Sequence, residues 1–432
     1  MTDSAKTWSE RTAFAGFDWA SDHHDLVVVD QRGEVLDNFR IADTAEGWRQ
    51  LRERLSGYPG LAIAIETSSG ATVERLLDAG YSVFPINPKA AKWYRERKAP
   101  SGTKTDFVDA WSLADALRVD GHAWRALQPD DPLTVELRLL CRDEIALIEQ
   151  RTAFIGQLRA ALHEYYPIAL SAFDDWTTRS SWTFVERFPT PQALVSAGKR
   201  RWEKFLHTHQ LYHSAELYAK RLDLFAKADQ FCGGPAVTNA KSLLTKSLVA
   251  QLRLLQDHLD EYRRQITERF ERHPDHDLFG SLPGAGEKLA PRLPLTDPGP
   301  VKGLLAELGD DRARFDSHES LQCYAGTAPV SYESGQIRKT RLRHACSRIL
   351  RSTVHLWASL SRMKCPWAEA YYRRKREQGQ SHACALRCLG QRWLKILWKM
   401  WQTRSRYDAE LHQRNQVGHG SWVIGLLPAV GT

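Results

Sequence analysis

Short apolar runs separated by polar turns dominate the first 120 residues, and they predict an alternation of strands and helices. Runs at 13–17, 25–30 and 35–41, with Gly33 in the turn between the last two, predict a meander of three strands. The periodicity then predicts a helix, a strand, a helix, a strand and two further helices, at 44–56, 61–66, 71–79, 81–86, 88–97 and about 105–117. This order indicates an α/β domain that ends near the Pro-bearing break at 129–132.

Two long helical patterns flank a mixed segment at 167–240. The first covers 133–165, where apolar residues recur at threes, fours and their sums. The second covers 242–272 and steps by fours and threes through Leu248, Leu252, Leu255, Leu259, Tyr262, Ile266 and Phe270. This heptad-like seam predicts an antiparallel helical hairpin or coiled-coil arm, and an ordinary helical-bundle core fits it equally well.

A third region begins at Leu282-Pro283-Gly284-Ala285-Gly286, which is typical of a tight turn before a helix. Three prolines within 294–300 predict a loop, after which a helix resumes at 304–309. The last residues include an apolar stretch at 421–428, which we expect to dock on a neighbouring subunit or to fold back.

Four carboxylates carry the candidate chemistry. Asp18 and Glu66 each follow an apolar run, and Asp106 and Asp109 are three apart, so they share a helix face. Singly, each favours a turn or cap role. Together they favour a site for a hard divalent cation, Mg²⁺ with Mn²⁺ as the alternative. We expect four other acids to lie on the solvated surface: Asp22, Asp25, Asp30 and Asp115.

The distribution of positive charge predicts a nucleic-acid partner. The 432-residue chain, long enough for two or three domains, has a net charge of +8, and residues 336–376 hold 12 Lys and Arg against one acid. Such a density favours phosphate contacts, and the expected nucleic-acid-binding residues are Arg338, Lys339, Arg341, Arg343, Arg348 and Arg351. No apolar stretch approaches the roughly 18 residues of a membrane span, and the N-terminus lacks a signal peptide, so we expect a cytoplasmic protein with no membrane partner.

The motifs resemble those of a known family. Lys104-Thr105-Asp106-x-x-Asp109-Ala110, the turn at 282–286, Tyr324-Ala-Gly-Thr-Ala-Pro329 and Ser334-Gly335 are similar to those of IS110/IS1111-type insertion-sequence transposases. The resemblance implies a ribonuclease-H/RuvC-like α/β domain with the acidic DEDD set at 1–128, a helical coiled-coil arm at 129–275, a mainly α transposase domain at 276–408, and a tail at 409–432.

The resemblance also implies an activity: Mg-dependent strand cleavage and exchange by a DNA recombinase. Ser334 is the implied nucleophile, Ser331 competes with it, and a simple turn residue is the alternative. The implied partners are target and donor DNA ends on the bacterial nucleoid, a structured noncoding RNA, and further copies of the chain in a dimer or tetramer. The implied site joins the carboxylates of one domain to the serine of another. Two other functions stay open: a RuvC-type Holliday-junction endonuclease that uses water, and a non-catalytic nucleic-acid-binding scaffold.

Overall fold

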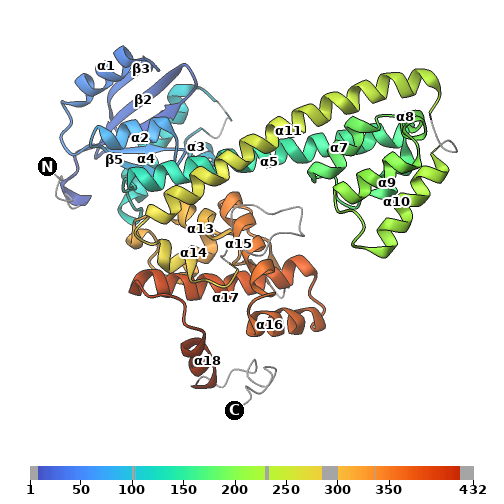
Figure 1. Cartoon of the computed structure of the whole chain (residues 1–432). Coiled ribbons are helices and arrows are strands. Elements are labelled where there is room, and N and C mark those ends of the chain that lie inside the picture. Colours follow the sequence, from blue (N-terminus) through green and yellow to red (C-terminus); the bar gives the residue numbers. More distant parts are fainter. Residues whose placement is uncertain are drawn as a thin grey trace. The chain divides into compact units, whose positions relative to one another are not determined.

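The computed structural model describes residues 8–99, 102, 104–228, 233–284, 300–335 and 337–418. Contacts divide the chain into two compact units, whose elements are labelled in Figure 1. The first unit consists of Met1–Asp131 and Asp310–Arg348, and the second of Pro132–Gly309 and Ile349–Thr432. The division into functional domains at 1–128, 129–275, 276–408 and 409–432 stays a prediction.

The first unit begins with the predicted order of strands and helices, and the boundaries differ by at most a few residues. The elements are η1 (Trp8–Glu10), β1 (Ala13–Trp19), β2 (His23–Asp30), β3 (Val35–Ala42), α1 (Ala45–Leu55), β4 (Ala62–Ile65), α2 (Ala71–Asp78), β5 (Ser82–Pro85), α3 (Pro88–Lys98), α4 (Asp106–Asp120) and η2 (Gly121–Ala123). The predicted α/β character of this part is therefore confirmed.

The five strands form one mixed sheet with helices on both faces. The strand order is β3-β2-β1-β4-β5, in which β1, β2 and β3 are antiparallel neighbours and β4 and β5 run parallel to β1. Alternate side chains of β1 enter different cores. Ala13, Ala15 and Phe17 pack with α1 and α2, whereas Phe14 packs with α3 and α4. This two-sided burial explains why the strands are almost entirely apolar.

The second segment of the first unit carries a small hairpin. Its elements are η4 (Arg312–Arg314), α14 (His318–Tyr324), β6 (Val330–Ser334) and β7 (Ile337–Arg341), and the two strands pair antiparallel. Two polar contacts tie this segment to the N-terminal one: Arg125 forms an ion pair with Asp316, and the Asp131 amide donates to the Asp310 carboxylate at 2.8 Å.

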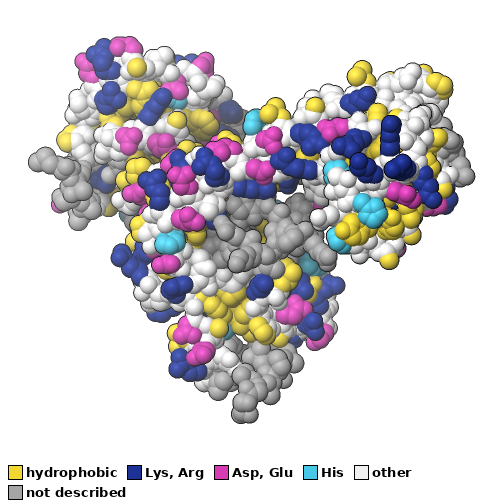
Figure 2. Space-filling view, in the orientation of Figure 1, with side chains coloured by type: hydrophobic (Ala, Val, Ile, Leu, Met, Phe, Trp, Pro, Cys, Tyr) yellow, Lys and Arg dark blue, Asp and Glu magenta, His cyan; other side chains and the backbone are white. Residues whose placement is uncertain are grey.

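The second unit is built on two long helices, α5 (Pro132–Tyr165) and α11 (Pro235–Arg272), which pack side by side (Figure 1). They are antiparallel, because residues late in α11 pair with residues early in α5. Arg269 binds Glu136 at 3.0 Å, whereas Lys241, near the start of α11, binds Glu164 at 2.7 Å. Figure 2 shows Lys and Arg side chains interspersed with acids along these helices. The predicted helices are confirmed, and their coiled-coil character stays a prediction.

In the described residues, a cap of five short helices lies between the C-terminal end of α5 and the N-terminal end of α11. Its helices are α6 (Pro167–Ala172), α7 (Arg179–Arg187), α8 (Pro191–Ala197), α9 (Lys199–Thr208) and α10 (Ala215–Lys227). The cap has its own aromatic core, in which the Trp202 and Phe205 rings stack with centroids 5.5 Å apart. The Trp202 indole donates to the Arg221 carbonyl at 2.8 Å, so its buried N–H is satisfied.

The remaining helices of the second unit are α12 (His276–Gly280), α13 (Pro300–Leu308), α15 (Arg348–Ser361), α16 (Pro366–Glu377), α17 (His382–Thr403) and α18 (Ala409–Gly418). The turn at Pro283 packs against α15, because the Trp357 indole donates to the Pro283 carbonyl at 3.0 Å. Residues 285–286 of that turn, most of the proline-rich loop at 294–300 and the apolar stretch at 421–428 lie outside the described residues. Among the described helices, none combines the length and apolar character that a membrane crossing requires.

Candidate functional site

Three carboxylates lie at one edge of the sheet, and their side chains are on the same face. Strands β1 and β4 are parallel and Phe17 pairs with Ile65, so the next residues, Asp18 and Glu66, stand at the same edge. Asp25 of β2 is the antiparallel partner of Asp18. Strand alternation assigns all three side chains to the face covered by α3 and α4, together with the core residues Phe14, Val27 and Ala64.

Helix α4 approaches β1 closely and brings two more carboxylates to this edge. A Cβ atom added to Gly16 would lie 1.8 Å from the Ala110 carbonyl oxygen, so only glycine permits this contact. The helix begins one turn earlier, where the Thr105 hydroxyl accepts a hydrogen bond from the Val108 amide at 3.2 Å and so caps the helix. Asp106 and Asp109 lie in that first turn, where the helix dipole favours negative charge.

The electrostatics show that these carboxylates form one cluster. Burial raises the pKa of Asp18 to about 6, and the charges of Asp109, Glu66, Asp106 and Asp25 contribute to this rise, in that order. Burial and the charge of Asp109 also raise the pKa of Glu66, against the opposing charges of two basic residues, Arg95 and Lys104. The structure therefore brings together all four predicted carboxylates, which we call the acidic cluster: Asp18, Glu66, Asp106 and Asp109.

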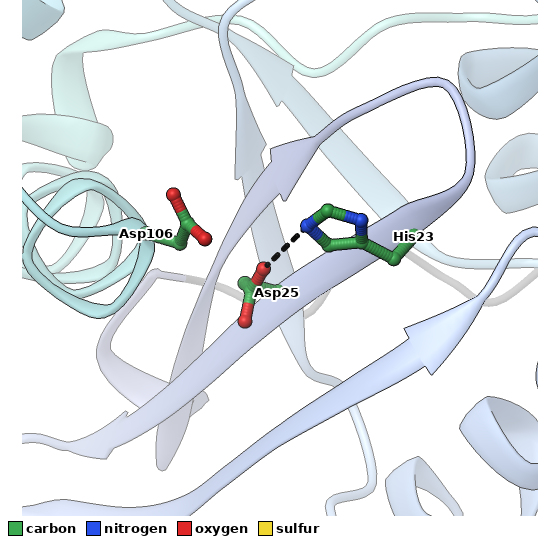
Figure 3. Close-up of side chains that lie close together, drawn as sticks. All are labelled: His23, Asp25 and Asp106. Atoms are coloured by element: carbon green, nitrogen blue, oxygen red, sulfur yellow. Dashed lines mark ion pairs between the residues drawn. The ribbon is translucent and has the colours of Figure 1, made fainter.

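Two arginines neutralise the α4 side of the acidic cluster. Arg95 of α3 binds Asp109 at 2.7 Å, and Arg40 of β3 bridges Asp106 at 2.6 Å and Asp25 at 2.9 Å. His23 lies beside Asp25, with its Nε2 atom 3.7 Å from the carboxylate (Figure 3). Ligand atoms of His23, Asp25 and Asp106 lie within 4.8 Å of one another, so this flank also offers donors to a cation.

Two of the acids expected on the solvated surface are not there. The Asp25 side chain is 14 % exposed and faces Asp18, and the Asp115 side chain is 3 % exposed. Asp115 can be buried because three cations form ion pairs with it, namely Arg97, Lys98 and Arg118. Burial raises the pKa of Asp115, but the hydrogen bonds and charges of Lys98 and Arg118 outweigh burial and lower it. Asp22 is exposed as expected, and Asp30 accepts from the amides of its own turn. A signal for Asp25 was its place on the strand that follows Asp18 in a tight hairpin.

Ser334 ends β6, one residue before Gly335, whose φ of +58° lies in the left-handed region. The five residues of β6 are all exposed. Among the described residues, none makes a hydrogen bond to the Ser334 side chain. Ser331, the competing residue, lies on the same strand and pairs with Thr340.

The predicted basic residues fall on two elements and the connection between them. Lys339 and Arg341 are exposed on β7, with Arg338 in the same strand, and the Arg341 guanidinium lies 5.0 Å from the Tyr332 ring centroid. Arg343 follows β7, is half-buried and donates to the Ala328 carbonyl at 3.3 Å, which gives it a structural contact. The other two, Arg348 and Arg351, lie in the first turn of α15.

Comparisons with known proteins identify the family. A family model described as a transposase matches residues 15–167, and one described as the IS116/IS110/IS902 transposase family matches residues 276–373. A Streptomyces coelicolor protein described as the mini-circle putative transposase for IS117 is 34% identical over 408 residues, covering 92% of this chain and 96% of that protein. A 42 kDa protein of insertion element IS900 from Mycobacterium paratuberculosis is 27% identical over 401 residues, covering 91% and 96%. The chain therefore belongs to the IS110 family of transposases.

Proposed function

We propose that this transposase is an Mg-dependent DNA recombinase that cleaves and exchanges strands through Ser334. The observation that carries the proposal is the convergence of the acidic cluster at one sheet edge, where burial and mutual repulsion raise the pKa of Asp18 to about 6. Carboxylates held together at such a cost are typical of a site that a cation completes. A structured noncoding RNA from the element would select the target and donor DNA, and a dimer or tetramer would act on the bacterial nucleoid.

The donor set fits a hard divalent cation. Asp18, Glu66, Asp106 and Asp109 supply oxygen ligands only, which suits Mg²⁺ or Mn²⁺. Bound there, the metal would polarise the scissile phosphate and make the serine hydroxyl easier to deprotonate. Arg40 and Arg95 already neutralise Asp106 and Asp109, so both arginines would have to share or release these carboxylates when a cation binds.

Ser334 would then perform nucleophilic catalysis. Its Oγ atom would lose its proton and form a bond to phosphorus, while the bond from phosphorus to the oxygen of the departing strand breaks and that oxygen takes up a proton. The phosphoserine link would keep the energy of the phosphodiester, so that strand exchange needs no ATP. The exposed end of β6 leaves this hydroxyl accessible to a large substrate such as DNA.

The test is a covalent protein–DNA adduct. The full-length protein, with RNA transcribed from the flanks of its element, is mixed with labelled junction DNA and Mg²⁺ and run on a denaturing gel with and without protease. We expect a protease-sensitive shifted band for the wild type and for Ser331→Ala, and none for Ser334→Ala. An adduct that survives Ser334→Ala and disappears with Ser331→Ala would move the nucleophile to Ser331.

The second candidate is a RuvC-type junction endonuclease in which water replaces the serine. It is favoured by the absence, among the described residues, of any hydrogen bond to the Ser334 hydroxyl, whereas the acidic cluster is assembled. The same gel separates the two functions. Free nicked strands from both the wild type and Ser334→Ala would establish the endonuclease and return Ser334 to a turn residue.

We propose that the β6–β7 hairpin binds the nucleic-acid backbone through its exposed cations. Lys339→Gln with Arg341→Gln is expected to weaken DNA binding and to reduce the slope of log K against log salt by about 0.9 for each phosphate that is no longer neutralised. Arg32→Gln with Arg52→Gln removes the same charge from exposed positions of the same unit and serves as the control. Equal slopes for the two double variants would show that the hairpin does not contact the phosphates of the nucleic acid.

A further inference from the structure

A pocket of about 680 Å³ opens between α16, α17 and α18 in the second unit. This volume is within the range of about 300–1,000 Å³ that is typical of small-molecule sites. Its wall is mainly apolar and aromatic. Trp367 and Tyr371 come from α16, Tyr407 from the connection between α17 and α18, and His412 from α18. Figure 2 shows hydrophobic side chains gathered over the C-terminal helices, with Lys and Arg at their edge.

The aromatic wall is fixed by contacts between its own members. The Trp367 indole donates to the Tyr407 hydroxyl at 3.1 Å, and the Trp367 and His412 ring centroids are 4.7 Å apart. Burial lowers the pKa of His412, so its ring is neutral near pH 7 and adds an aromatic face without a charge. A preformed wall of this kind suits a planar ring, because the protein orders little more when the ring binds.

The rim carries an excess of positive charge. Arg392, Lys395 and Lys399 are spaced by three and four on α17, so they share one exposed face of that helix, and Arg406 follows in the connection. In the described part of the chain, no carboxylate forms an ion pair with any of these four side chains. Among the described residues that line the pocket, Asp408 is the one acid. Near α16 the pattern differs, because Glu369 of α16 forms ion pairs with Arg373 of the same helix and with Arg362, which precedes it.

From this juxtaposition we propose that the pocket binds one unpaired nucleotide of single-stranded DNA. The base would stack against the aromatic wall, and the flanking phosphates would contact the α17 cations, the combination that single-strand binding uses. The proposal rests on the proposed function in that DNA is the partner, but it assigns a site made of residues other than the acidic cluster and Ser334. A strand opened during exchange would supply such a nucleotide.

The direct test is photo-crosslinking of the full-length protein. A short oligothymidylate with one central 5-iododeoxyuridine is bound without Mg²⁺, irradiated, and the crosslinked peptide is mapped by mass spectrometry. We expect the crosslink on Trp367, Tyr371, Tyr407 or His412. Crosslinks confined to other residues, for example Tyr332 of the β6–β7 hairpin, would overturn the proposal. Tighter binding of an oligouridylate of the same length would overturn the assignment to DNA.

A charge variant supplies an independent measurement. Lys395→Gln with Lys399→Gln should reduce the salt slope of single-strand binding by about 1.4, at about 0.7 for each neutralised phosphate. Lys204→Gln with Lys246→Gln removes the same charge from exposed positions outside the pocket and should leave the slope unchanged. Equal slopes in the two variants would contradict the phosphate contacts.

The two proposals fail separately. Single-strand binding is measured without metal and without cleavage, so an absent crosslink with a normal Ser334 adduct removes the pocket assignment alone. A normal crosslink with no adduct removes the recombinase chemistry alone.

Discussion

Replacing Asp18 by Asn is expected to abolish strand cleavage, by a factor of about 10³ or more, while making the metal-free protein more stable at pH 7. The loss of cleavage follows from the removal of a proposed metal ligand at the centre of the acidic cluster, since one group that stabilises developing charge is already worth about 10²–10³ in rate. The gain in stability follows from the pKa of Asp18, which burial and neighbouring carboxylates raise from 3.8 to about 6.

The sign of the stability effect is fixed by this pKa. Between about pH 4 and pH 6 the folded protein holds a proton on Asp18 that the unfolded chain has released, so wild-type stability falls as the pH rises through this window. At about 1.4 kcal/mol for each pKa unit, and with allowance for solvent screening of a half-buried group, ionised Asp18 costs the fold roughly 1–2 kcal/mol. Asp18→Asn removes this cost.

Thermal unfolding with and without Mn²⁺ measures both effects. Without metal, Asp18→Asn should unfold at a higher temperature than the wild type at pH 7 and at about the same temperature at pH 4. With metal, the wild type should gain stability and the variant little, since binding to the folded state alone stabilises it. Asp22→Asn, at a side chain that is 80 % exposed, is the control. If the wild type and the Asp18→Asn variant gained the same stability from the metal, Asp18 would not be a metal ligand.

Replacing Gly16 by Ala is expected to destabilise the first unit by about 3 kcal/mol or more and to separate the carboxylates. The new Cβ would lie 1.8 Å from the Ala110 oxygen and 2.6 Å from the Ala114 nitrogen, both of them backbone atoms that cannot rotate away. Helix α4 would have to move outward as a whole, at a cost at or above the usual 1–3 kcal/mol of overpacking. The melting temperature should fall by roughly 6–12 °C, at about 2–4 °C per kcal/mol.

Gly57→Ala provides the comparison, because the nearest atom to its added Cβ is 3.8 Å away and the residue lies in the same unit. Its melting temperature should stay within about 2 °C of the wild type. The displaced α4 should also deprive Gly16→Ala of its Mn²⁺ response, which a purely local decrease in stability would leave intact. A normal melting temperature for Gly16→Ala would show that α4 does not approach β1 this closely.

The sequence predicts the sheet and the acidic cluster well because their signals are local. Each strand of the first unit is a short apolar run, and Asp18 and Glu66 follow such runs directly, so strand alternation suffices to place them. The neutralising residues carry no local signal. Arg40 lies 66 positions from Asp106, and the role of Asp25 appears only when β1 and β2 pair. Asp115 looks like a polar residue on a helix until the three cations around it are seen.

The sequence also does not predict that the β6–β7 hairpin belongs to the same compact unit as the N-terminal sheet. Chain order places 310–348 within a single C-terminal region, whereas contacts group this segment with the N-terminal sheet. The contacts responsible include Asp131 with Asp310 and Arg125 with Asp316, which are polar pairs 179 and 191 positions apart. Such pairs leave no periodic pattern, so only the folded chain reveals them.

Because α5 and α11 pair in antiparallel orientation, the length of the two helices sets the distance between the aromatic cap and the opposite end of the pair. Each residue adds about 1.5 Å along a helix, and seven residues return nearly to the same face. Removing seven residues from both helices would therefore bring the aromatic cap about 10 Å nearer to the opposite end of the pair and keep its orientation. Removing them from one helix alone would break the pairings that Arg269 and Lys241 make with α5. The spacing between the cap and the C-terminal helices can thus change during evolution, but only by matched steps in two distant stretches of sequence.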